Sequence, residues 1–162
     1  MTEEDLSVKI KTDALRLLSF RPRSVEELRQ RLRQKKYTAE AIQEVIETLT
    51  KQGLLNDALF AKMFANSKVL GRPVGKRQLE IDMKKKGLSA PLIRQTLGGL
   101  EDYDEKKTAM DLARERFLRM EGLSDEKKKA RLFGFLKRRG FSNDAIFGAI
   151  RELLKNTEGL ED

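Results

Sequence analysis

The sequence contains one segment three times over, and this repetition limits the possible fold more than any other feature. Three stretches align without a gap: LRQKKYTAEAIQEVIETL (32–49), MKKKGLSAPLIRQTLGGL (83–100) and LKRRGFSNDAIFGAIREL (136–153). Their first residues are about 51 and 53 positions apart, a period typical of arrays that stack one supersecondary unit on the next. The chain is therefore expected to use one structural unit three times.

The pattern shared by the three stretches predicts two helices joined by a tight turn. Each has a Thr or Ser that can cap a helix, preceded by an apolar residue and followed four positions later by isoleucine, as in a hydrophobic staple. The capping residues are Thr38, Ser89 and Ser142. Two positions earlier, Gly87 and Gly140 suit the left-handed turn that ends the preceding helix. Lys36 takes this place in the first stretch, so the first turn is expected to bend differently.

Each stretch has a more basic helix before its turn and a further helix before that, so each unit should hold three helices. We expect Ser24 with Glu27 to cap the first basic helix, Asp125 to cap the third, and Asp57 to cap the first helix of the middle unit. The predicted divisions are residues 1–55 with an N-terminal extension, 56–104, 105–155, and a frayed tail at 156–162. The sequence thus predicts an all-α protein of three tandem three-helix repeats.

The composition limits the function. Lys and Arg number 34 against 26 Asp and Glu, and the net charge of +8 favours an anionic partner: nucleic acid first, then an acidic protein or membrane surface. Cysteine and histidine are both absent from the sequence, which excludes disulfides and thiolate zinc sites and removes the usual general base. Adjacent acids such as Glu26 and Glu27 point to different sides of a helix. We expect neither catalysis, nor a cofactor, nor a metal site.

No apolar signal segment opens the chain, and no run approaches the length of a membrane span. A cytoplasmic protein without a membrane partner is therefore expected.

Positive charge is concentrated in the second helix of each unit and in the loops at its ends. Residues 127–139 carry seven cations and no acid. We expect this face to bind phosphates or acidic side chains, while a merely solvated helix face is the simpler alternative. The candidate binding residues are Arg21, Arg23, Arg31, Arg72, Lys76, Arg77, Lys84, Lys85, Lys86, Lys128, Lys129, Lys137, Arg138 and Arg139.

Two further features allow both a functional and a structural interpretation. The loop GRPVGKRQ (71–78) is either an anion site at a helix start or an ordinary connection between helices. Most aromatic residues have spacings typical of core packing, Phe60 with Phe64 among them. Phe133 and Phe147 are less constrained by the pattern and are candidates to face outward.

In order along the chain, four stretches resemble the motifs of the bacterial RecX proteins, a family that modulates the recombinase RecA. They are FRPRSVEELRQRL, LLNDALFAKMFANSK, GRPVGKRQLEIDMKKKGL and FLKRRGFSNDAI, and the resemblance runs from about residue 13 to residue 154. Asp57, Phe60 and Ala61 match the family's D-x-x-F-A positions, with Asn56 in place of the commoner first acid.

The resemblance implies a non-enzymatic, elongated and curved array of three-helix units that binds the RecA filament and contacts single-stranded DNA, with duplex DNA as a further partner. It also implies inhibition of RecA ATP hydrolysis, strand exchange and coprotease activity, and hence modulation of recombination and the SOS response. We expect a monomer. Two alternatives stay open: a stand-alone nucleic-acid-binding protein built from helix-turn-helix-like units, and a protein-interaction scaffold with a basic face.

Overall fold

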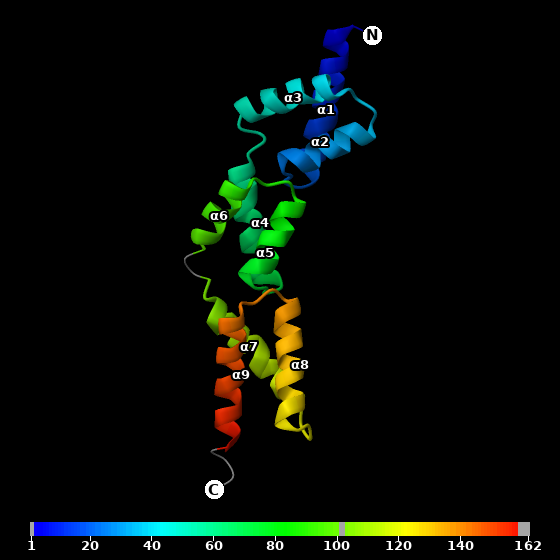
Figure 1. Cartoon of the computed structure of the whole chain (residues 1–162). Coiled ribbons are helices and arrows are strands. Elements are labelled where there is room, and N and C mark those ends of the chain that lie inside the picture. Colours follow the sequence, from blue (N-terminus) through cyan, green and yellow to red (C-terminus); the bar gives the residue numbers. More distant parts are fainter. Residues whose placement is uncertain (1, 101–102, 159–162) are drawn as a thin grey trace. The chain divides into compact units, whose positions relative to one another are not determined.

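The computed structural model describes residues 2–100 and 103–158, and within these residues the chain forms nine α-helices and no strand (Figure 1). The helices are α1 (Glu3–Phe20), α2 (Val25–Gln34), α3 (Ala39–Lys51), α4 (Asp57–Gly71), α5 (Lys76–Lys85), α6 (Ala90–Gly98), α7 (Glu105–Phe117), α8 (Asp125–Arg138) and α9 (Asn143–Glu158). They form three successive groups of three. The predicted all-α fold of tandem three-helix repeats is confirmed.

By their contacts, the helices of the three repeats group into two compact units. The first comprises Met1–Phe64 and Met83–Thr96, and the second comprises Ala65–Asp82 and Leu97–Asp162. The helices of the middle repeat are therefore divided between the two units. The first and third repeats each keep a core of their own.

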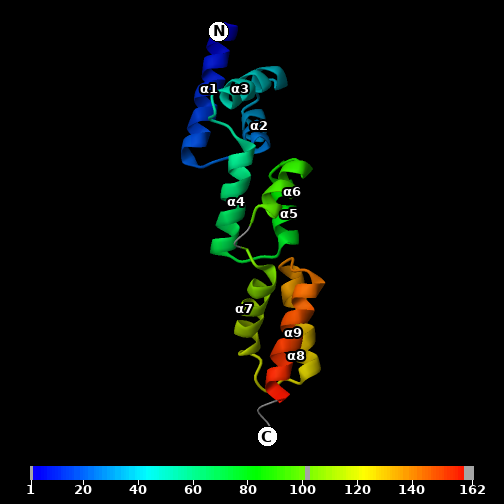
Figure 2. The same ribbon diagram turned by 90° about the vertical axis from the view of Figure 1, so that its left-hand side faces the viewer.

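In the first unit, α1, α2 and α3 lie together (Figure 2), and their buried side chains form an aliphatic core. Leu28 and Leu32 on α2 are fully buried, as is Ile10 on α1. Ile10 precedes the region of family resemblance, which begins at about residue 13, so the N-terminal extension contributes to this core. The predicted N-terminal extension is thus the first part of α1, which starts with a capping box between Thr2 and Asp5.

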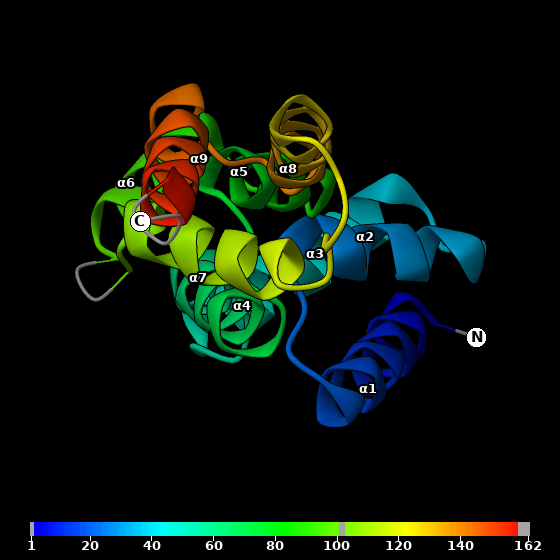
Figure 3. The same cartoon turned by 90° about the horizontal axis from the view of Figure 1, so that it is seen from below.

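In the second unit, α8 and α9 run antiparallel and α7 packs against both (Figures 1 and 3). Two small residues on α7, Ala109 and Ala113, are fully buried and let the other two helices approach closely. Phe141 lies in the turn between α8 and α9 and is only 1% exposed. The ring of Phe141 is part of the core of this unit. The sequence repeat predicts a hydrophobic staple at this position.

The three predicted caps at the start of the third helices are confirmed. The hydroxyl oxygens of Thr38, Ser89 and Ser142 each accept a backbone N–H three residues later, at 3.3, 3.4 and 3.3 Å. Ser24 and Glu27 also form the predicted capping box on α2. These are contacts within one helical turn, so the spacing of residue types was sufficient to predict them.

Two predicted caps are wrong by one residue. Ser124, not Asp125, caps α8 by accepting the Lys127 N–H. Asn56 caps α4, because its side-chain oxygen accepts the Leu59 N–H at 3.0 Å. The carboxylate of Asp57 is directed instead to α2 of the same unit.

The expectation of a different first turn is also wrong. Lys36 has a φ of 65°, close to the 76° of Gly87 and the 79° of Gly140. All three turns therefore use the left-handed conformation, although lysine reaches it at a cost of about 1 kcal/mol that glycine avoids.

At the C-terminal end, α9 continues to Glu158, which includes the first three residues of the predicted tail. The rest of that tail, 159–162, lies outside the described residues.

Candidate functional site

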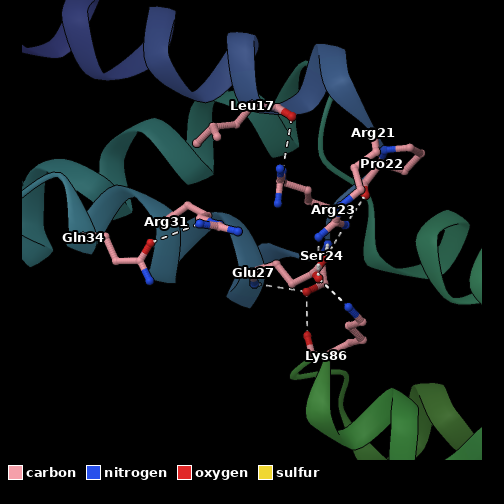
Figure 4. A network of polar contacts seen from close by, with 9 residues as sticks. All are labelled: Leu17, Arg21, Pro22, Arg23, Ser24, Glu27, Arg31, Gln34 and Lys86. Atoms are coloured by element: carbon pink, nitrogen blue, oxygen red, sulfur yellow. Dashed lines mark hydrogen bonds and ion pairs between the residues drawn. The ribbon is translucent and has the colours of Figure 1, made fainter.

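The loop before α2 is held by a polar network centred on Glu27 (Figure 4). Both Glu27 carboxylate oxygens accept from the Arg21 guanidinium, at 3.0 and 3.1 Å, and Oε1 also accepts from Lys86 Nζ at 2.7 Å. Ser24 donates its hydroxyl to the Lys86 carbonyl at 2.5 Å. Arg21 and Lys86, both predicted to bind an external partner, thus neutralise an internal carboxylate.

The network perturbs the ionisation of Glu27 strongly. Its side chain is only 13% exposed, and burial alone would raise its pKa. Hydrogen bonds from Arg21, Lys86 and Ser24 outweigh burial and lower the pKa from 4.5 to about 2. Glu27 is therefore charged throughout the physiological range, and two cations are committed to it.

Arg23 is committed in a similar way. Its Nε donates to the carbonyl of Leu17 at 3.2 Å, and the side chain is partly buried. Burial, then the charges of Arg21 and Arg31, lower the pKa of its guanidinium. We interpret Arg23 as a link between α1 and the loop that follows it.

We call the contact between the loop before one basic helix and the end of the next basic helix a joint. A second joint lies in the second unit, with its residues 51 to 53 positions further along the chain. The Gly75 N–H donates to the Arg139 carbonyl at 2.8 Å, and the Arg139 guanidinium donates back to the Pro73 carbonyl at 3.1 Å. A β-carbon on Gly75 would lie 2.1 Å from the Gly140 carbonyl oxygen. Only glycine permits this approach, whereas the equivalent Ser24 makes its contact through a side chain.

In both joints a carboxylate from a later helix caps the start of the basic helix. Asp57 accepts the Val25 N–H at 2.8 Å, and Glu105 accepts the Lys76 N–H at 3.0 Å. Tyr103 adds a hydrogen bond from its hydroxyl to the Val74 carbonyl. Within the loop 71–78, the Gly75 and Lys76 N–H groups are thus bonded inside the protein, and the interpretation of the loop as an anion site stays a prediction.

A cluster of guanidinium groups surrounds Phe135 in the second unit. Arg116 and Arg139 lie over its ring, with the guanidinium carbons 4.7 and 5.2 Å from the ring centroid. Burial, followed by the charges of Arg72 and Arg116, lowers the pKa of Arg139. Two guanidinium groups on one aromatic ring, with the charge of Arg72 acting on one of them, are a suitable binding site for phosphate oxygens.

Arg116 was missed in the sequence because it lies on α7, outside the basic second helices. The position of Arg116, four residues after Leu112, indicates only which residue is its neighbour on α7. The ring that Arg116 covers, Phe135, belongs to α8. No local pattern connects the two residues.

The other candidates divide by exposure. Lys128 lies over the Phe117 ring at 4.9 Å, and Lys137 donates to Asn143 at 2.8 Å, so both have local partners. Lys76 is half-buried. The candidates with exposed side chains outside the two joints are Arg31, Arg72, Arg77, Lys84, Lys85, Lys129, Lys137 and Arg138. Lys84 and Lys85 end α5, while Lys137 and Arg138 occupy the equivalent place on α8.

Over the residues that the structure describes, no helix is long and apolar enough to cross a bilayer, and no three acidic side chains gather as a metal site would require.

Three family models match the chain in succession: the first three-helix domain of RecX at residues 11–49, the second at 56–97 and the third at 102–150. A relative from Thermobifida fusca (strain YX), named "Regulatory protein RecX", is 32% identical over 98% of this chain and 85% of its own length. The chain belongs to the RecX family. A relative of the same name from Streptomyces coelicolor is 34% identical over 91% of this chain and 81% of its own. The crystal structure of RecX from Lactobacillus salivarius matches with a TM-score of 0.83 at 25% identity, covering 93% of this chain and 97% of that one.

The first joint is built by residues of a stretch that resembles a RecX family motif. The stretch R-P-R-S-x-x-E-L at 21–28 carried part of the resemblance to RecX. Its Arg21, Arg23, Ser24 and Glu27 build the first joint, so this motif holds the repeat architecture together.

Proposed function

We propose that this RecX-family protein regulates the RecA recombinase by binding its filament and inhibiting ATP hydrolysis, strand exchange and coprotease activity. Recombination and the SOS response are then modulated in the cytoplasm. The observation that carries the proposal is the match, over nearly the whole chain, to relatives named "Regulatory protein RecX". The protein acts as a monomer and catalyses no reaction of its own, in keeping with a sequence that lacks histidine and cysteine.

The binding surface that we propose consists of the candidate cations whose side chains are exposed and lie outside the two joints. Lys84 and Lys85 in one repeat and Lys137 and Arg138 in the next offer charge at equivalent helix ends. Each contact is weak, since exposed ion pairs contribute about 0.2–1 kcal/mol. Repeated contacts along a filament add through avidity, and a protein that spans neighbouring RecA subunits hinders the motions that hydrolysis needs.

The guanidinium cluster at Arg72, Arg116 and Arg139 supports a second contact, to the phosphates of single-stranded DNA. Arginine binds phosphate through paired N–H donors. The guanidinium groups of Arg116 and Arg139 pack on the ring of Phe135. This cluster is also the feature that favours the alternative, a stand-alone nucleic-acid-binding protein. Against the alternative, α3 presents exposed Glu40, Glu44 and Glu47 where a recognition helix would meet DNA.

The test is a titration of this protein into RecA hydrolysing ATP on single-stranded DNA. We expect hydrolysis to fall at equimolar or lower ratios to RecA. Undiminished hydrolysis, together with tight salt-sensitive binding to naked duplex, would support the alternative instead.

Substitutions that remove the exposed positive charges test which surface binds the filament. The pairs Lys84→Gln with Lys85→Gln, and Lys137→Gln with Arg138→Gln, should each weaken filament binding about tenfold, equivalent to about 1.4 kcal/mol. The matched control is Lys9→Gln with Arg16→Gln, which removes two exposed charges from α1 outside the predicted surface. Equal effects of all three double variants would mean that net charge, not this surface, governs binding.

A further inference from the structure

Helices α8 and α9 line an open, largely apolar groove of about 840 Å³ in the second unit. Phe133 and Phe147 form part of it, with ring centroids 5.5 Å apart, and Ile150 and Leu154 add aliphatic surface. Phe147 is 51% exposed, a high value for a phenylalanine. The groove is within the range of about 300–1,000 Å³ found for ligand sites.

The repeats show that the fold does not require this aromatic pair. Phe133 and Phe147 have equivalents at the same alignment positions in the other two repeats. These are Arg29 and Gln43 in the first repeat, and Glu80 and Arg94 in the second. In the first repeat the two side chains hydrogen-bond at 3.0 Å across the corresponding helices, α2 and α3. A polar pair therefore serves the architecture at this place, and the aromatic pair of the third repeat calls for another explanation.

The charges around the groove indicate the chemistry of an occupant. Among the described residues that line it, Lys129, Arg151 and Lys155 are cationic and none is acidic. Arg151 and Lys155 are four positions apart on α9, the spacing of one helical turn. Acidic side chains one turn apart on a helix lying along α9 would meet both cations.

We propose that the groove between α8 and α9 binds an amphipathic helical segment of an acidic protein partner. Apolar side chains on one face of that helix rest on Phe133 and Phe147, and flanking carboxylates pair with Arg151, Lys155 and Lys129. This surface is distinct from the basic helix ends used in the proposed RecA contact. The inference stands whichever protein supplies the helix.

Nucleobase stacking accounts less well for the same residues. A stacking platform offers an open ring face to each base. Here Phe133 is partly buried against the core of the unit, and its ring is tilted by 32° against that of Phe147. The two rings pack against each other and line the groove together with Ile150 and Leu154.

The experiment uses the full chain and a fluorescein-labelled peptide of about 18 residues, with leucines at helical spacing and glutamates elsewhere. We expect fluorescence anisotropy to show saturable binding, and NMR shifts of the labelled protein to concentrate in α8 and α9. A peptide with lysine in place of glutamate should bind at least about tenfold more weakly.

The key variant is Phe133→Arg with Phe147→Gln, which installs the pair that the first repeat already accommodates. It should fold, as circular dichroism will verify, and lose at least about tenfold in affinity for the acidic peptide. Arg151→Glu should give a similar loss without touching the apolar floor. Phe20→Gln is the matched control, because Phe20 is 73% exposed and lies on α1 in the other unit.

Three results would overturn the proposal: equal binding of acidic and basic peptides, full affinity in the folded double variant, or shifts outside α8 and α9. Loss of oligothymidylate binding in Phe147→Gln, without acidic-peptide binding to the unaltered protein, would assign the rings to nucleic acid instead. ATPase inhibition is measured separately, so failure here leaves the RecA proposal intact.

Discussion

Replacing Glu27 by glutamine keeps the shape of the first joint and removes its central charge. In the folded protein this carboxyl has a pKa of about 2, against the ordinary value of 4.5 expected in the unfolded chain. One pKa unit corresponds to about 1.4 kcal/mol, so the difference amounts to about 3 kcal/mol. Arg21 and Lys86 are 45% and 31% exposed, and solvent screens their attraction. We therefore expect Glu27→Gln to destabilise the protein by about 2 kcal/mol near neutral pH.

The effect has a defined dependence on pH. Because the folded pKa is depressed, the stabilisation by Glu27 is fully present above pH 4.5 and is lost as the pH falls towards about 2. The difference in stability between the unaltered protein and Glu27→Gln should therefore shrink from about 2 kcal/mol to near zero over this window. Below about pH 2 both proteins carry an uncharged group at position 27.

Urea unfolding at a series of pH values, followed by circular dichroism, measures this difference. Hydrogen exchange of the α2 amides reports the opening of the same joint locally. Glu44→Gln serves as the control, since Glu44 is exposed on α3 of the same unit and should change stability by less than about 0.5 kcal/mol. A difference for Glu27→Gln that is constant across the window would refute the assignment of the charge network.

The remaining predictions concern backbone positions. Lys36→Gly should raise the stability to urea unfolding by about 0.5–1 kcal/mol, because glycine adopts the φ of 65° without the steric cost; a loss of stability would contradict this. Gly75→Ala should destabilise the second unit by about 3 kcal/mol or more, since the new β-carbon would meet the backbone of Gly140 at 2.1 Å. Gly71→Ala is its control: a β-carbon there has no atom within 4 Å, so thermal unfolding should be nearly unchanged.

Features that depend on a few neighbouring residues were accessible from the sequence. The caps at Thr38, Ser89 and Ser142 and the glycine turns follow from interactions that span three to five positions. The wrong caps at Asp57 and Asp125 show the limit of such reasoning. Adjacent polar residues compete for one place, and spacing alone did not decide between them.

The assignment of cations to function was harder, because a charge in a sequence does not reveal its partner. Arg21 and Lys86 lie 65 positions apart and meet on one carboxylate, which only the packing of the first unit brings about. Arg116 reaches Phe135 in the same manner within the second unit. The exposed cations at the ends of α5 and α8 stay predictions as binding residues.

By itself, the sequence determined the helical repeat, its turns and its excess of positive charge, since these arise from hydrophobic periodicity, capping and composition. The tertiary structure alone decided which cations are committed to the joints and which face solvent. It also revealed that one repeat carries an aromatic groove where another carries a hydrogen-bonded polar pair. The physical reason is the same in each case: local backbone preferences act over one helical turn, whereas ion pairs and grooves depend on side chains brought together from distant helices.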